Sequence, residues 1–131
     1  MIFYSQSKGL YTFPDGSTAP SYSGFGDGIN NPAMEGIADV GPIPQGVYDH
    51  GAPLAVGPGH TGAYVIPLTP DAETRSRIIA MGRGPDSFFN HGDTESDVEL
   101  HLELASRGCI ISGRTTRVKV AALPDSITVT A

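Results

Sequence analysis

The chain has 131 residues, enough to bury a hydrophobic core, and we predict a single domain over residues 1–131. Fourteen acidic side chains against eight basic ones give a net charge of −6, which disfavours binding to nucleic acids and to anionic membranes. Seventeen glycines and eleven prolines argue against a helical bundle and favour short strands joined by turns.

No run of residues approaches the apolar length that crosses a bilayer, so we expect no membrane span. The first thirteen residues lack a basic segment followed by an apolar one, and we therefore expect synthesis in the cytoplasm without a signal peptide. With one cysteine the chain cannot form an internal disulfide, so packing is expected to supply its stability.

The N-terminal third predicts a hairpin and then a long loop. Residues 1–5 and 10–13 are β-prone, and the glycine that ends residues 6–9 suits the turn between them. A second turn is expected at residues 14–17, which contain Asp-Gly. Residues 19–46 are broken by Gly, Pro and Asn, so we expect an ordered but irregular loop of the kind that often carries function.

The middle of the chain predicts two strands and the best helix candidate. Strands are expected over residues 46–50 and 62–68. Thr69 is expected to cap the helix and Pro70 to occupy its first position, with acidic residues in the first turn. The last part of this segment, residues 77–81, is also compatible with an extended conformation.

The C-terminal third adds further short elements. Residues 86–92 are a β-prone run, and residues 95–106 alternate polar and apolar side chains as a half-buried strand does, although a loop is also possible there. Residues 113–123 are compatible with a helical turn or a strand, and residues 126–131 predict a strand. The sum is a mostly β fold with one or two short helices.

Cys109, the single cysteine, follows His91 by eighteen positions. A cysteine nucleophile needs a base that forms the thiolate, and His91 could supply it if a backbone carbonyl or the carboxylate of Asp93 held its ring. Gly92 lets the chain turn after the histidine, and N–H groups near Gly108 and Cys109 could form an oxyanion hole. Because a lone cysteine is more often a small buried apolar residue, this pair alone leaves both interpretations open.

Other chemistries use some of the same residues. His91, Asp93, His101 and Cys109 are ligand types that zinc accepts, but no compact pair of His or Cys occurs at the usual ligand spacing. A papain-type peptidase is excluded by order, since those chains place cysteine before histidine. A binding module without catalysis stays an alternative.

Three motifs resemble, in order, those of the L,D-transpeptidase catalytic domain. They are Gly-Pro-Ile-Pro-Gln-Gly-Val-Tyr within residues 40–48, His-Gly-Asp at 91–93 and Ser-Arg-Gly-Cys-Ile at 106–110. With Asn-Asn-Pro-Ala-Met at 30–34, they are most similar to the small subfamily of such domains found as type VI secretion effectors. The resemblance covers nearly the whole chain and implies a compact β-sandwich or β-barrel.

This resemblance implies that Cys109 is the acylated nucleophile, His91 its general base and the Gly92 carbonyl the group that orients the imidazole. The implied substrate is the peptidoglycan tetrapeptide stem, cleaved between meso-diaminopimelate and D-alanine through a thioester. Water then gives L,D-carboxypeptidase action, whereas a D-amino acid or a second stem gives exchange or a crosslink. No cofactor is implied.

The resemblance also implies an antibacterial effector. Its partners would be a type VI secretion delivery component and a cognate immunity protein in the producer's periplasm, and it would act in the periplasm of a target Gram-negative bacterium. In one respect the chain departs from the larger family, which has histidine where Arg107 stands.

The remaining charged and polar candidates have weaker assignments. Arg107 could bind a substrate carboxylate or be a surface charge. Asp93 could bind the diaminopimelate amine or occupy a turn, and Ser106 could orient substrate or hold the cysteine turn. For Arg114 and Arg117 we expect a solvated face rather than a substrate contact.

Overall fold

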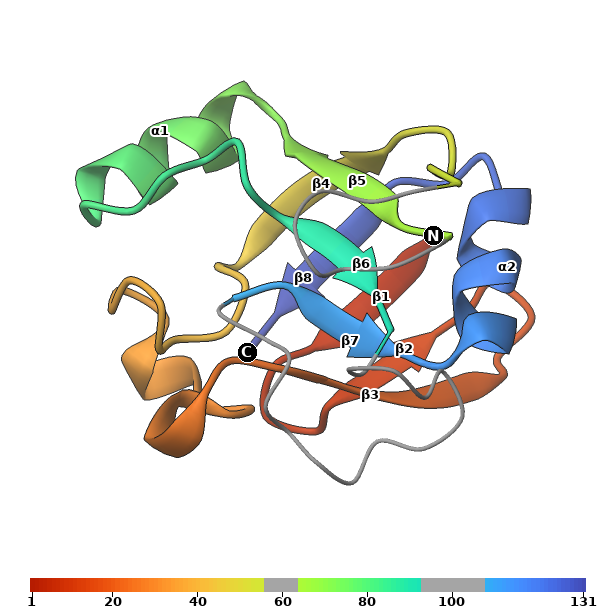
Figure 1. Ribbon diagram of the computed structural model, residues 1–131, viewed down its shortest axis with the longest axis horizontal. Helices are drawn as coiled ribbons and strands as arrows, with labels where there is room; N and C mark the ends of the chain where they lie inside the picture. Colours follow the sequence, from red (N-terminus) through yellow and green to blue (C-terminus); the bar gives the residue numbers. More distant parts are fainter. Residues whose placement is uncertain (56–63, 93–107) are drawn as a thin grey trace.

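The computed structural model describes residues 1–55, 64–92 and 108–131, and these residues form a closed barrel of eight strands (Figure 1). Around the barrel the strand order is β1-β2-β3-β7-β6-β5-β4-β8. The two α-helices lie on opposite sides of the barrel. This confirms the predicted mostly β fold with short helices, as a barrel rather than a sandwich.

In chain order the elements are β1 (Ile2–Ser5), β2 (Leu10–Thr12), β3 (Thr18–Ser23), η1 (Gly26–Gly28), η2 (Pro32–Met34), β4 (Gly46–His50), β5 (Ile66–Pro70), α1 (Ala72–Ala80), β6 (Phe89–His91), β7 (Ile110–Ser112), α2 (Arg114–Ala122) and β8 (Ile127–Thr130).

The first and last strands close the barrel through a shared pattern of burial. In β1, Ile2 and Tyr4 are buried while Phe3 is exposed, and β8 buries Ile127 and Val129 in the same alternating way. The two strands pair in parallel with Ile2 opposite Ile127. Because side chains alternate between the faces of a strand, this register sends both buried sets into the barrel interior.

A polar network crosses the interior and ties β6 to β7. The Tyr11 hydroxyl donates to Asn90 Oδ1 at 2.8 Å, and Asn90 Nδ2 donates to the Ile110 carbonyl at 3.0 Å and to Ser112 Oγ at 2.7 Å. Asn90 is fully buried, so each of these polar groups needs its partner. The network therefore fixes the relative position of the two strands that carry the candidate site.

Most predicted elements of the first half are present, with one correction. The hairpin is formed by β1 and β2, and the strand at residues 46–50 is β4. However, β3 occupies Thr18–Ser23 and so covers the start of the segment expected to be an irregular loop. This strand forms because it pairs with β2 on one side and with β7 on the other, which no local pattern of residues 19–46 reveals.

The helix after β5 begins later than predicted. Thr69 and Pro70 belong to β5, and the cap is Asp71, whose side chain accepts a hydrogen bond from the Thr74 N–H at 2.9 Å. Pairing with β4, where Tyr48 lies opposite Pro70, keeps these two residues extended. Helix α1 then runs to Ala80, so the alternative of an extended end is wrong.

In the last third, residues 113–123 contain the helix α2 rather than a strand, and β8 confirms the predicted C-terminal strand. The predicted alternating strand at residues 95–106 lies outside the described residues. Within the described ranges, neither helix has the length and apolar character needed to span a bilayer.

Candidate active site

The two candidate catalytic residues lie on adjacent parallel strands, one at the C-terminal end of its strand and the other before the N-terminal end. His91 is the last residue of β6, and Cys109 directly precedes β7. The strands pair in parallel, with Asn90 opposite Ile110 and His91 opposite Ile111. Extending this register by one residue sets Cys109 opposite Phe89 of β6. Neighbouring strands lie about 4.8 Å apart, and His91 is two residues, or about 6.6 Å, further along β6 than Phe89. Two residues that are eighteen positions apart in the sequence thus lie on adjacent strands, while their catalytic pairing stays a prediction.

His91 is buried and oriented by its own backbone neighbour. Its Nδ1 lies 2.9 Å from the carbonyl oxygen of Gly92. A ring that donates from Nδ1 to a carbonyl carries its basic lone pair on Nε2. This is the contact that the resemblance implies for Gly92, while its catalytic importance stays a prediction.

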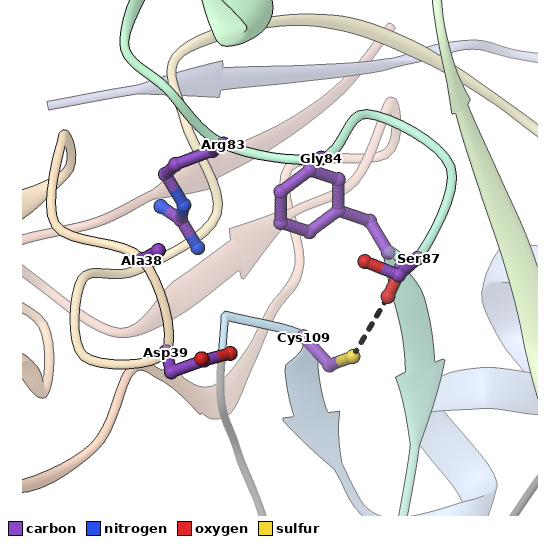
Figure 2. Close-up of a pocket in the computed structure, with 7 residues that line it drawn as sticks. Ala38, Asp39, Arg83, Gly84, Ser87 and Cys109 are labelled. Atoms are coloured by element: carbon purple, nitrogen blue, oxygen red, sulfur yellow. Dashed lines mark hydrogen bonds between the residues drawn. The ribbon is translucent and has the colours of Figure 1, made fainter.

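Cys109 is half-buried and protonated at neutral pH. Its thiol donates to the Ser87 carbonyl, with 3.6 Å between sulfur and oxygen (Figure 2). Burial raises the pKa of the thiol to about 11, although a hydrogen bond from the Phe89 backbone and the positive charge of Arg83 act in the opposite direction. Attack by this sulfur therefore requires a base that takes its proton.

The turn before Cys109 is braced by a serine from β3. The Ile43 N–H donates to Ser23 Oγ at 2.8 Å, and the Ser23 hydroxyl donates to the Gly108 carbonyl at 3.2 Å. Ser23 is fully buried, so it links the cysteine turn to the Gly-Pro-Ile-Pro segment. Gly108 has φ +123°, and a Cβ there would collide with the guanidinium of Arg83, so only glycine suits this position.

Arg83 is a site residue that the sequence interpretation missed. It is buried, and its Nη1 donates to the carbonyls of Glu35 at 2.6 Å and Pro42 at 2.7 Å, while Nη2 donates to Gly41 at 3.4 Å. The guanidinium also lies 5.3 Å from the centre of the Phe88 ring. Its place between two glycines after α1 is the only local signal, and that signal is not specific.

A pocket of about 260 Å³ opens beside the thiol (Figure 2). Side chains of opposite charge face it, the guanidinium of Arg83 and the carboxylate of Asp39. Cys109 forms part of its wall, so a group held in the pocket lies next to the sulfur. Its lining residues are Ala38, Asp39, Arg83, Gly84, Ser87, Phe88 and Cys109.

Several predicted site residues lie outside the described residues, namely Asp93, His101, Ser106 and Arg107. The zinc alternative and the role of Arg107 therefore stay as predictions. Among the residues that the structure does describe, no group of three or more His, Cys, Asp or Glu is gathered around one point.

The two arginines of α2 differ from one another. Arg114 is exposed, as predicted, and lies over the Tyr64 ring. The expectation of a solvated Arg117 is wrong, because this side chain is fully buried and donates to the carbonyls of Tyr64 and Ser112. Carbonyl acceptors supplied by distant parts of the chain make this burial possible.

Solved structures of similar fold include those of two bacterial proteins. The helical cell shape determining protein Pgp2 from Campylobacter jejuni matches 98% of this chain and 46% of its own, with a TM-score of 0.60 and 17% identity. Bd1075 of Bdellovibrio bacteriovorus matches 99% of this chain and 46% of its own, with a TM-score of 0.62 and 14% identity. The chain thus spans about half the length of either protein. No protein-family model and no curated protein matches it.

Proposed function

We propose that the chain is a cysteine L,D-carboxypeptidase/L,D-transpeptidase that acts on the tetrapeptide stems of peptidoglycan. The observation that supports the proposal is the parallel pairing of β6 and β7, because a carbonyl-oriented His91 ends one strand and the half-buried Cys109 immediately precedes the other. The motifs around these residues resemble the L,D-transpeptidase domain, and a protein of similar fold is a cell shape determining protein.

In the proposed reaction, His91 Nε2 takes the thiol proton as the sulfur attacks the carbonyl between meso-diaminopimelate and D-alanine. Backbone N–H groups around Gly108 and Cys109 stabilise the oxyanion. When the C–N bond breaks, the imidazolium gives its proton to the departing amine of D-alanine, and a thioester stays on Cys109. Water, deprotonated by His91, then releases the tripeptide and restores the thiol; a D-amino acid amine attacking instead gives exchange.

The biological setting of the proposal rests on the sequence resemblance alone. In this setting, the single domain is an effector that a type VI secretion component carries into the periplasm of a Gram-negative target. A cognate immunity protein protects the producer's own periplasm. Removal of the terminal D-alanine would deprive the wall of stems for crosslinking.

The direct test is incubation with purified disaccharide-tetrapeptide and mass analysis of the products. Wild-type protein should release one alanine, and Cys109→Ala and His91→Gln should each lower the rate by about 10³-fold or more. Asp27→Asn changes an exposed carboxylate that does not line the pocket, so it is the matched control and should keep full activity. Absence of any product from wild type, with and without added D-amino acids, would refute the proposal.

A non-catalytic module that binds peptidoglycan is the second candidate. The raised pKa of the Cys109 thiol favours it, because an unactivated thiol is what a binding module would contain. This candidate predicts that muropeptides bind without product and that Cys109→Ala leaves their affinity unchanged. Product formation by wild type would eliminate it.

A further inference from the structure

One wall of the pocket presents a carboxylate in an unusual backbone conformation. Asp39 has φ 62°, in the left-handed region that non-glycine residues rarely adopt, and its side chain is exposed at the pocket. Within the parts of the chain that the structure describes, no hydrogen bond or ion pair involves this carboxylate.

The opposite charge comes from Arg83, whose position is set by carbonyl groups rather than by an acid. Its hydrogen bonds to Glu35, Gly41 and Pro42 use three of the five N–H donors of a guanidinium. The carboxylates of Asp39 and Glu35 lie near enough to favour the charged guanidinium, but within the described ranges neither forms a salt bridge with it. Among the described residues, Nε and one hydrogen of Nη2 have no acceptor, and Nη2 is the atom that lies nearest Gly108.

The size and the charges of the pocket together indicate what it accepts. A volume of about 260 Å³ is below that of most sites for drug-sized ligands, so it suits a group of amino-acid size. Figure 2 shows the guanidinium of Arg83, the carboxylate of Asp39 and the sulfur of Cys109 around the same space. A ligand with one negative and one positive group would satisfy both charged side chains at once.

We infer that this pocket recognises a zwitterionic α-amino acid group, with Arg83 binding its carboxylate and Asp39 its ammonium. The inference rests on the proposed function in one respect: that reaction supplies such groups at the free end of meso-diaminopimelate and on an incoming D-amino acid. Arg83 and Asp39 are then specificity-determining residues that hold the ligand beside the thiol. They perform the two tasks that the sequence suggested for Arg107 and Asp93.

Binding can be tested without turnover in the Cys109→Ala variant. NMR titration would use D-alanine, D-lactate, which replaces the ammonium by hydroxyl, and D-alaninamide, which lacks the carboxylate. D-Alanine should bind about tenfold or more tightly than either analogue, as expected for loss of one charged hydrogen bond. Equal affinity for all three compounds, or no binding of D-alanine at concentrations where the pocket should fill, would overturn the inference.

Substitution of Asp39 then assigns the charges. Asn tolerates the left-handed conformation, so Asp39→Asn removes charge while retaining the backbone. It should abolish the preference for D-alanine over D-lactate and keep the preference over D-alaninamide, whereas Asp27→Asn should change neither. Arg83→Lys, checked for folding by circular dichroism, should weaken the preference over D-alaninamide, since lysine lacks the planar fork.

The outcomes separate this inference from the proposed function. Selective binding of D-alanine that depends on Asp39, in a protein that never releases alanine from tetrapeptide, would retain the inference and refute the enzyme. Conversely, turnover by wild type combined with an Asp39→Asn variant of unchanged selectivity would retain the enzyme and overturn the inference.

Discussion

Buried side chains hold strand β7 at both ends, but only one end faces a pocket. At the C-terminal end, Arg117 donates to the Ser112 carbonyl, and Asn90 donates to the Ser112 hydroxyl. At the N-terminal end, the Ser23 hydroxyl donates to the Gly108 carbonyl, and the guanidinium of Arg83 lies beside Gly108. The half-buried thiol of Cys109 comes next in the chain. Helix α2 continues directly from the first end, whereas the second borders an open space of about 260 Å³.

This contrast shows how one short strand can serve both as an anchor and as a site. At the C-terminal end, the carbonyl and the hydroxyl of Ser112 are both committed to neighbours inside the fold. Arg83, at the other end, forms no salt bridge within the described residues and uses three of its five donors there, and Cys109 is only partly buried. Three changes test this contrast.

Loss of Arg117 should damage the anchored end most. Arg117→Met keeps much of the side-chain volume but leaves the carbonyls of Tyr64 and Ser112 without this donor, which we expect to cost about 3 kcal/mol of unfolding free energy. Urea unfolding measures the change. Arg114→Met, three residues earlier on the same helix and exposed, should cost less than about 1 kcal/mol. Equal costs for both variants would contradict the contrast.

Removal of the Ser23 hydroxyl should loosen the end that carries the thiol. Ser23→Ala leaves the Ile43 N–H and the Gly108 carbonyl without this partner, an expected cost of about 2 kcal/mol, and activity should fall more than stability predicts because the cysteine turn shifts. Ser21→Ala is the matched control on the same strand. The buried Ser21 hydroxyl has no partner among the described residues, so its loss should be neutral or slightly stabilising.

The smallest effect concerns the thiol itself. Because the pKa of Cys109 is raised on folding to about 11, the protonated thiol contributes stability below about pH 9 that is lost as the pH rises toward 11. Between about pH 8 and pH 10, the free energy of unfolding of wild type should fall by about 1 kcal/mol relative to that of Cys109→Ala. This value includes a reduction for solvent screening, because Cys109 is only partly buried. Tyrosine titration is common to both proteins and cancels.

Alkylation by iodoacetamide gives an independent reading of the same pKa. The rate for the native protein should rise with a midpoint near the raised pKa, whereas the urea-unfolded chain should show a midpoint near 8.5, roughly the value for a free cysteine. A native midpoint below about pH 8 would instead indicate a resting thiolate and a different first step.

Local pattern predicts the parts of the fold that depend on local chemistry. The hairpin of β1 and β2 and the strand β4 follow from β-prone residues between glycine-containing turns. β3 could not be found in this way, since it contains Pro20 and its strand conformation comes from pairing with β2 and β7. The helix cap is ambiguous in the sequence because Thr69 and Asp71 are both good capping residues, and only the pairing of β5 with β4 decides between them.

For the site, sequence motifs identify the residues whose roles depend on short spacing. The contact between His91 and the Gly92 carbonyl joins neighbours in the chain. Arg83, in contrast, bonds to carbonyls 41 to 48 positions away, and an arginine whose partners are distant carbonyls leaves no pattern around it. Asp39 lies in a loop that the sequence predicts to be functional, but its orientation toward the thiol depends on how that loop is folded over the barrel.

The parallel pairing of β1 with β8 has a consequence for how the chain folds. Ile2 and Ile127 are opposite one another although 125 residues separate them, so closure costs the entropy of a very long loop and is expected late in folding. Until residues 127–130 arrive, β1 and β4 each keep an unpaired edge, because both pair with β8. A nascent or partly unfolded chain would therefore expose two strand edges prone to aggregation, and rapid closure matters for the yield of native protein.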